Sequence, residues 1–374
     1  MQIWIYVVKW NGVSRLVAGM LLFVACLVGG VLAPAAFCAC LYVGIINNTA
    51  RFDPQSASIQ QLHVLKAIGL LHLPLLYLCI WSLGPAGQLD LIECIFVFCA
   101  ATVWFGQIAD RAAHDLIRAG HRLGLIGQAS LLTGHRVSAK RLLHNPQIGT
   151  PPDMSAPCLT ETFWQYAMRL WRQEYSSGLS AETRKRRKHA HGLHPYLVYT
   201  LWTFTTLITS YALSGALGLG AMIALSVLVS GQSLLNEYVE RFGLVRRILP
   251  NGQHEDFGRR HVWHPPKSTH TAIQQDEYAS GQFPIWPYPR PKMLWTALLP
   301  ARWQTEMADR AAVWRIPANG SMDGFDFAGV TASSRALAGQ APDNLATWRH
   351  EMDSVLPVSQ RAKRARNRSR HERD

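Results

Sequence analysis

Histidine is the residue type in this chain with the clearest potential for chemistry. The 374 residues include 15 histidines, which is many for this length. Imidazole is a common metal ligand, and ligands on one helical face need a spacing of about three or four residues. His261 and His264 have this spacing, but Pro265-Pro266 follows them at once. Spacing alone therefore gives weak support for a metal site. Eleven histidines lie between residues 114 and 270, at positions 114, 121, 135, 144, 189, 191, 194, 254, 261, 264 and 270.

The elements that would have to position these side chains are strongly apolar. Apolar residues make up 49% of the chain and charged residues only 16%, with long apolar runs before residue 111 and from 194 to 240. This pattern excludes a disordered chain and fits a soluble globule poorly. The seven cysteines are an odd number, lie mostly inside the apolar runs and form no CxxC pair. They therefore indicate neither a disulfide framework nor a zinc ribbon or haem-attachment motif.

The apolar runs predict an all-α integral membrane protein with about six transmembrane helices. Residues 16–46 are too many for one span and few for two, and Gly29, Gly30 and Pro34 offer a turn. We expect a tight hairpin of two helices there, with a single helix as the alternative. A polar cap is expected from the loops after the fourth and sixth helices. The expected helices cover residues 16–31, 34–47, 62–84, 91–111, 195–214 and 219–240, and the glycine-rich segment 215–220 separates the last two.

The distribution of charge predicts the orientation of these helices. The formal net charge is +13, yet the turns near 31–34, 85–90 and 215–220 carry no Lys or Arg. Because Lys and Arg concentrate on the side that is not translocated, both termini should face the cytoplasm of a bacterium or the matrix of a mitochondrion. The membrane would be the bacterial or the mitochondrial inner membrane. The basic run 184–188 is either an anchor for anionic lipid head groups or a solvated loop that only sets topology.

Several motifs follow one another in a recognisable order. Residues 113–118 read AHDLIR, 134–153 read GHRVSAKRLLHNPQIGTPPD, 236–246 read NEYVERFGLVR, and 283–310 read FPIWPYPRPKMLWTALLPARWQTEMADR. Together they resemble the integral-membrane alkane hydroxylases and fatty-acid desaturase-like proteins, whose histidine boxes hold two irons. The resemblance runs from about residue 60 to residue 312. It implies a membrane domain over residues 1–310, followed by a basic C-terminal extension over 311–374.

The resemblance also implies which positions would carry the iron ligands, and most are no longer histidine. Only His114 and His144 persist, and residues 271–284 contain none of the histidines of the family's last box. A cation about 5 Å from a divalent ion is opposed by roughly 6 kcal/mol at an effective dielectric constant of about 20. We therefore expect a degenerate member with no catalytic residue and no metal. The ligand positions implied by the resemblance are His114, Arg118, Lys140, His144, Asn145 and Arg241.

Two alternatives to an empty site remain at this stage. One is a rebuilt mononuclear metal site that draws its ligands from the remaining histidines. The other is an active di-iron alkane hydroxylase or fatty-acid desaturase, which needs two iron ions and an electron donor. The histidines available for the mononuclear site are His114, His144, His135, His261, His264 and His270.

The degenerate boxes favour a non-catalytic protein, a structural or lipid-binding accessory subunit of a larger membrane complex. A respiratory assembly of the mitochondrial inner membrane is one such complex. Arg118, Lys140 and Arg241 would bind the carboxylate or phosphate of a bound fatty acid or phospholipid, since such groups are the usual ligands of Arg and Lys. The alternative is an internal salt-bridge network without a ligand, for which the expected acidic partners are Asp115, Glu237 and Glu240.

The C-terminal extension predicts contacts with protein partners. It ends in RAKRARNRSRHERD, a composition that does not fold alone. Because basic residues are not interleaved with aromatic ones there, we expect no specific nucleic-acid binding. A transporter is disfavoured, since the spans contain no detectable inverted repeat.

Overall fold

A computed structural model describes residues 2–47, 59–144, 155–188, 193–244, 246, 261–264 and 284–314. Regular structure in these ranges is helical, without strands, and His264 and Ile285 form an isolated β-bridge. The chain divides into two compact units, which are described separately. The first comprises Met1–Asn145 and Trp171–Asn236, and the second comprises Pro146–Leu170 and Glu237–Asp374. The division expected at residue 310 stays a prediction, because residues 315–374 lie outside the described ranges.

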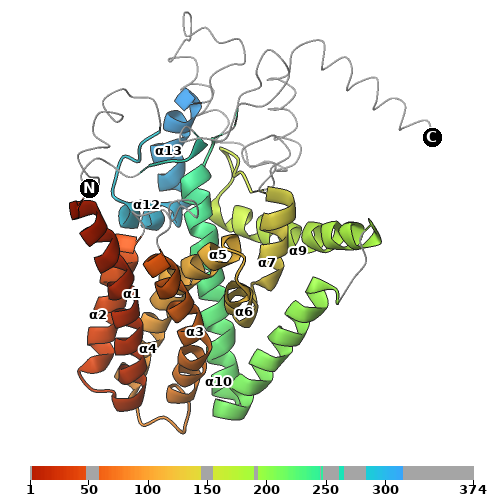
Figure 1. Ribbon diagram of the computed structural model, residues 1–374. Helices are drawn as coiled ribbons and strands as arrows, with labels where there is room; N and C mark the ends of the chain where they lie inside the picture. Colours follow the sequence, from red (N-terminus) through yellow and green to blue (C-terminus); the bar gives the residue numbers. More distant parts are fainter. Residues whose placement is uncertain are drawn as a thin grey trace, which may run out of the picture. The chain divides into compact units, whose positions relative to one another are not determined.

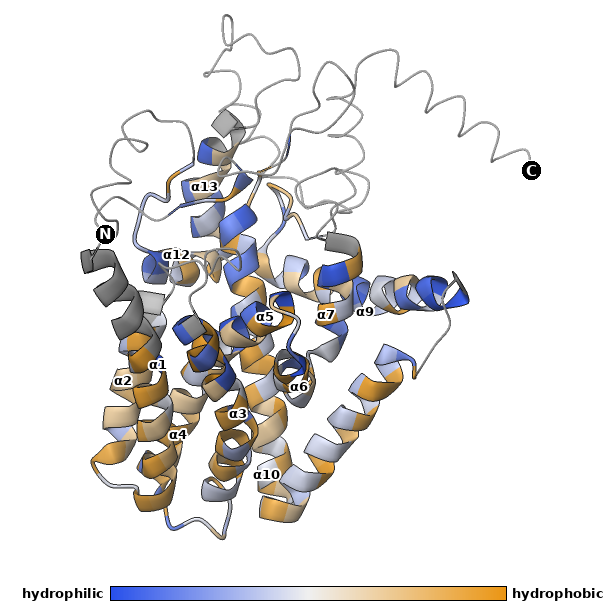
Figure 2. Ribbon diagram, viewed as in Figure 1, coloured by the Kyte–Doolittle hydropathy of each residue, from blue (hydrophilic) through white to orange (hydrophobic). Residues whose placement is uncertain are grey.

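The first unit contains a bundle of apolar helices that stand side by side in Figure 1. They are α1 (Gln2–Val28), α2 (Leu32–Asn47), α3 (Ile59–Ser82) and α4 (Leu91–Val103). α1 contacts α2 and α3, and α2 contacts α4. Side chains such as Leu22, Ile68, Leu75 and Trp104 are fully or almost fully buried among them. In Figure 2 the coloured parts of these helices are largely apolar, as a membrane bundle requires.

Two glycines make the hairpin between α1 and α2. Gly29 and Gly30 have φ angles of 67° and 61°, a left-handed conformation that costs least for glycine. Pro34 lies in the first turn of α2, where its missing N–H is tolerated. The first helix begins at Gln2 instead of near residue 16. The expected start was the beginning of the apolar run, and Lys9 and Arg15 shorten that run although a helix can contain them.

The fourth helix begins at a capping box and continues beyond its expected end. Glu93 N donates to Asp90 Oδ1 at 2.7 Å, and Asp90 N donates to Glu93 Oε2 at 2.9 Å, which satisfies two amides of the first turn. After α4 the helical path runs through a π-helical segment, η1 (Trp104–Ala109), into α5 (Asp110–Arg118). The helical stretch expected to end at 111 therefore ends at Arg118.

The remaining helices of the first unit are shorter, apart from two. α6 (Arg122–Ser130), α7 (Gly134–Ala139) and the π-helical η2 (Lys140–His144) precede α9 (Phe163–Lys188), which lies in this unit from Trp171 onward. α10 (Pro195–Arg241) is broken at Ser214 and Gly215, where Gly215 has φ 61° and ψ −148°. The Ser214 hydroxyl donates to the carbonyl of Ile80 at 2.8 Å. The glycine-rich separator expected at 215–220 is thus a kink, after which the helix resumes.

Three of the described helical stretches are long and apolar enough to cross a membrane. They are Gln60–Ser82, Leu91–Arg118 and Pro195–Arg241. Two shorter apolar helices, Val13–Val28 and Leu32–Gly44, accompany them. The helical fold and its membrane character are confirmed at this level, whereas the count of six spans and the polar cap stay predictions.

The second unit has an aromatic core. Tyr238 packs against Tyr166, Phe242 and Trp303 with ring centroids 5.3–5.5 Å apart. Trp303 belongs to α13 (Pro300–Trp314), which follows α12 (Arg290–Ala297). Residues 284–289 precede α12 without helical structure, as expected for a segment with three prolines.

Candidate functional site

In the first unit, His114 lies between an acidic and a basic side chain. Its Nε2 is 3.7 Å from Asp110 Oδ1 and 3.4 Å from Lys140 Nζ. Gln128 Nε2 donates to the same oxygen of Asp110 at 2.6 Å. We call Asp110, His114, Gln128 and Lys140 the His114 cluster. It combines a carboxylate, an imidazole, an amide and an ammonium that contact one another.

Local helix geometry explains how the sequence assembles the His114 cluster. Asp110 and His114 are four residues apart on α5, so they share one face. The π-helical η1 ends just before Asp110, and η2 begins at Lys140; π-helical turns are frequent at functional sites. Gly124 lets α6 approach α5 closely, because a Cβ there would lie 2.3 Å from the carbonyl oxygen of Ala113. This approach is what brings Gln128 of α6 to Asp110.

The three basic residues expected to share a site, Arg118, Lys140 and Arg241, contact different residues. Arg118 is 65% exposed, and its Nη1 lies 3.9 Å from Asp115 Oδ1, so Asp115 pairs with it as expected. Arg241 belongs to the second unit, where its Nη1 donates to Ser155 Oγ at 2.6 Å. Glu240, another expected partner, forms its ion pair with Arg290 at 3.2 Å. A joint site for Arg118, Lys140 and Arg241 stays a prediction.

The other two ligand positions implied by the resemblance are less fully described. His144 is the last residue of η2. Asn145 lies outside the described residues, as does His270. The structure places Lys140 next to His114, and the whole expected ligand set stays a prediction.

The histidines considered for a mononuclear site belong to two separate groups. His135 lies in the first unit, and His261 and His264 lie in the second. His261 is buried, and the backbone of His264 accepts from Trp286 N at 2.7 Å and donates to the carbonyl of Pro284 at 2.9 Å. Within the described ranges, no group of three or more His, Cys, Asp or Glu residues could hold a metal ion.

His135 is a buried aromatic contact of α7. Its ring meets those of Trp171 and Tyr175 on α9, with centroids 5.8 Å apart in each case. Burial lowers the pKa of His135 to about 4, against an opposing effect of the Glu174 carboxylate and with a further lowering by Arg136. His135 is therefore neutral at physiological pH.

This burial predicts a pH-dependent loss of stability. Because the folded-state pKa of His135 lies below its ordinary value of 6.5, the unfolded chain binds more protons between these values. The contribution of neutral His135 to the free energy of unfolding is complete above pH 6.5. It is lost as the pH falls toward 4, and the loss is about 2 kcal/mol near pH 5. Unfolding of the wild type and of His135→Phe in detergent, measured from about pH 7 to pH 5, should show a shallower decline for the variant. Parallel profiles would contradict this assignment.

Buried polar contacts of the first unit involve residues that the sequence analysis did not identify. Arg136 Nε donates to Glu174 Oε2 at 2.8 Å, and both side chains are almost fully buried. Glu182 accepts from Ser138 Oγ and from Arg141 Nη2, each at 2.8 Å. The sequence feature that could have indicated these contacts is the pair Glu174 and Glu182, which are eight residues apart and so lie on one face of a helix. Their basic partners on α7 and η2 could not be chosen from sequence.

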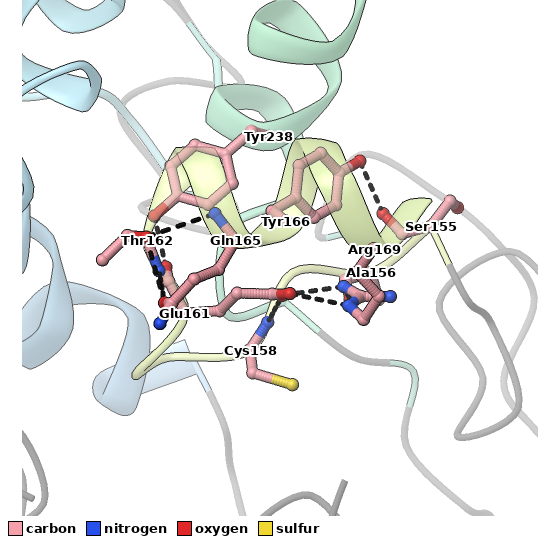
Figure 3. A network of polar contacts seen from close by, with 9 residues as sticks. All are labelled: Ser155, Ala156, Cys158, Glu161, Thr162, Gln165, Tyr166, Arg169 and Tyr238. Atoms are coloured by element: carbon pink, nitrogen blue, oxygen red, sulfur yellow. Dashed lines mark hydrogen bonds and ion pairs between the residues drawn. The ribbon is translucent and has the colours of Figure 1, made fainter. Parts of the chain in front are cut away.

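A second polar network lies in the second unit and is drawn in Figure 3. Glu161 accepts from Arg169 Nε at 2.6 Å and from Arg169 Nη2 at 2.7 Å. The Glu161 carboxylate also accepts from the backbone N–H of Cys158 at 3.3 Å. Tyr166 and Tyr238 donate their hydroxyls to the carbonyls of Ser155 and Glu161. These contacts attach the loop before α9 to the N-terminal part of α9 and to the C-terminal end of α10.

Comparison with known proteins gives one partial similarity of direct interest. No family model matches the chain. Over 192 residues, the chain is 26% identical to alkane 1-monooxygenase 2 of Pseudomonas aeruginosa. The matched segment is 49% of this chain and 51% of that protein, so the chain spans about half the length of the curated relative it matches. This similarity indicates an alkane hydroxylase-like relationship.

Proposed function

We propose that the chain is a non-catalytic membrane protein that retains an alkane hydroxylase-like helical scaffold. The observation that carries the proposal is the ammonium of Lys140, 3.4 Å from His114 Nε2. In the resemblance described above, both positions would hold iron ligands. An ammonium cannot ligate a metal, and its charge opposes a cation nearby. These residues do not fit an iron centre, and no reaction step is assigned to one.

The charge balance of the His114 cluster supports the same proposal. Asp110 receives a hydrogen bond from Gln128 and faces His114. The carboxylate is thus occupied by the chain's own polar groups. In this proposal, contacts among side chains replace metal contacts around His114 and Asp110, whose side chains are 25% and 14% exposed.

The alternative is an active di-iron alkane hydroxylase or fatty-acid desaturase. It is favoured by the partial identity with alkane 1-monooxygenase 2 and by the histidines retained at positions 114 and 144. It requires that the ligands come from positions other than Arg118, Lys140 and Arg241.

Metal content distinguishes the two functions directly. Full-length protein is extracted in mild detergent, and iron and zinc are measured per chain by elemental analysis. We expect less than about a tenth of an atom of either metal. About two irons per chain that are lost in His114→Ala and His144→Ala would overturn the proposal and indicate the active alternative. Arg118→Ala is the matched control on α5, because it removes a cation and no candidate ligand.

Lipid binding is a further part of this proposal. Arg118 and Lys140, with Arg241 of the second unit as the further cation expected from sequence, would hold the head group of a phospholipid or fatty acid. The exposure of Arg118 supports its availability. Lipids that co-purify with the wild type and with Arg241→Ala are compared by mass spectrometry. An unchanged lipid content would count against this role and favour an internal salt-bridge network.

The membrane arrangement belongs to the same proposal. Six spans would place both termini on the cytoplasmic or matrix side. The extension after residue 314 lies outside the described residues, and its basic composition supports a role in contacting other subunits of a membrane complex.

A further inference from the structure

α9 carries an exposed apolar stripe in the part that belongs to the first unit. Trp171, Tyr175 and Leu179 are 48%, 50% and 37% exposed. They are four residues apart, so they line one stripe along the helix. Both aromatic rings contact the ring of His135, and Tyr175 also contacts the ring of Tyr196; about half of each side chain is exposed. Earlier in the same helix, Trp164 and Met168 are exposed as well.

The neighbouring stripe of α9, which faces the protein, is polar. It consists of Glu174, Gly178 and Glu182, all buried. The two carboxylates bind basic and hydroxyl groups of α7 and η2. Gly178 allows the hydroxyl of Tyr196 to approach, since a Cβ there would lie 2.3 Å from that oxygen.

This arrangement reverses the usual order of an amphipathic helix. A surface helix of a water-soluble protein buries its apolar stripe and exposes its charges. Here the carboxylates are buried, and the apolar stripe, about a sixth of a turn away, is 37–50% exposed. Three large apolar side chains in a row would be costly in water, at about 25 cal/mol per Å² of apolar surface. The stripe is therefore suited to an apolar environment.

The direction of α9 and the charge at its end indicate what that environment is. In Figure 1, α9 runs across the direction of α1 to α4. It ends at Lys188, shortly before the candidate span Pro195–Arg241 begins. Figure 2 shows its C-terminal end as strongly hydrophilic, and Arg184, Lys185 and Arg187 are exposed there. A basic end beside an apolar stripe complements an anionic membrane surface, with about 1 kcal/mol of attraction per basic residue.

We propose that residues 171–188 of α9 form an interfacial membrane helix. Trp171, Tyr175 and Leu179 lie at the boundary between head groups and acyl chains, and Arg184, Lys185 and Arg187 contact anionic head groups. The inference goes beyond the proposed function and does not depend on whether the protein binds iron. Its ligand is the bilayer surface, not a lipid bound at Arg118 and Lys140.

Photochemical cross-linking in a bilayer tests the stripe. The full chain is placed in nanodiscs of phosphatidylcholine and phosphatidylglycerol, with p-benzoyl-phenylalanine in place of Tyr175. The matched control carries the same group in place of Ser176, which is exposed on the polar side of α9. We expect at least about threefold more lipid adduct at position 175 than at 176.

A second pair of variants shows whether the cross-linking preference holds at another position of the apolar stripe. Leu179 and Ser180 are replaced in the same way, and the same preference is expected at position 179. Equal lipid adducts at the paired positions would overturn the proposal. Protein adducts at 175 and 179 from native membranes, without lipid adducts, would also overturn it and identify the stripe as a protein interface.

The head-group contact has its own test. The triple variant Arg184→Gln, Lys185→Gln and Arg187→Gln removes three exposed charges and leaves the stripe intact. The fraction of phosphatidylglycerol among lipid adducts at position 175 should fall by about twofold or more, toward its fraction in the nanodisc. An unchanged fraction would overturn the head-group part of the proposal.

Discussion

Glu174→Ala should destabilise the first unit by about 3–5 kcal/mol, because it leaves the guanidinium of Arg136 buried without its carboxylate. The two side chains are 0% and 2% exposed, and the Nε to Oε2 distance is 2.8 Å. The buried cation then lacks one charge-assisted contact, so part of its desolvation cost is no longer offset. The free energy of unfolding in mixed micelles measures the effect.

Two controls separate this pair from general damage to α9. Arg172→Ala removes an exposed charge two residues away and should change stability by less than about 0.5 kcal/mol. The double variant Arg136→Met with Glu174→Met removes both charges while keeping volume, and should recover much of the loss. If Glu174→Ala behaved like Arg172→Ala, the buried ion pair would not be a stabilising contact of the fold.

Glu161→Ala should have the second-largest effect, about 3 kcal/mol, in the second unit. The Glu161 side chain is 1% exposed and accepts two hydrogen bonds from Arg169, which is 21% exposed. A two-pronged contact of this kind is among the strongest that proteins form. Its loss also frees the N–H of Cys158 in the loop before α9. Unfolding is measured as above, with limited proteolysis near residue 158 as a local readout.

The matched control for Glu161 is another acid of the second unit. Glu306 accepts one hydrogen bond from the Tyr288 hydroxyl at 3.2 Å and is half-buried. Glu306→Ala should cost less than about 1 kcal/mol, as for most partly solvated polar contacts. Equal losses in both variants would mean that the network in Figure 3 contributes no more than an ordinary surface contact.

Part of the candidate site could be predicted from sequence. The family resemblance implied that His114 and Lys140 occupy ligand positions, which stays a prediction, and the two side chains lie 3.4 Å apart. Asp115 was expected to pair with a cation, and it pairs with Arg118 within one turn of α5. Glu240 was expected to pair with one of the same cations, but its partner is Arg290, fifty residues later in the chain. Local pairs follow from helix periodicity, whereas distant pairs depend on how helices pack.

The sequence by itself determined the helical, membrane-type class of the protein and where its chain turns. Continuous apolar runs favour helices that can lie in a membrane, and Gly29, Gly30 and Gly215 adopt positive φ angles that other residues resist. Only the tertiary structure decided which charges distant in the sequence meet. Arg136 and Glu174 are 38 residues apart, and no pattern of hydropathy selects that pair over many others. It also decided that α9 would bury its carboxylates and expose its apolar stripe, because the side of a helix that faces the protein depends on the groups packed against it.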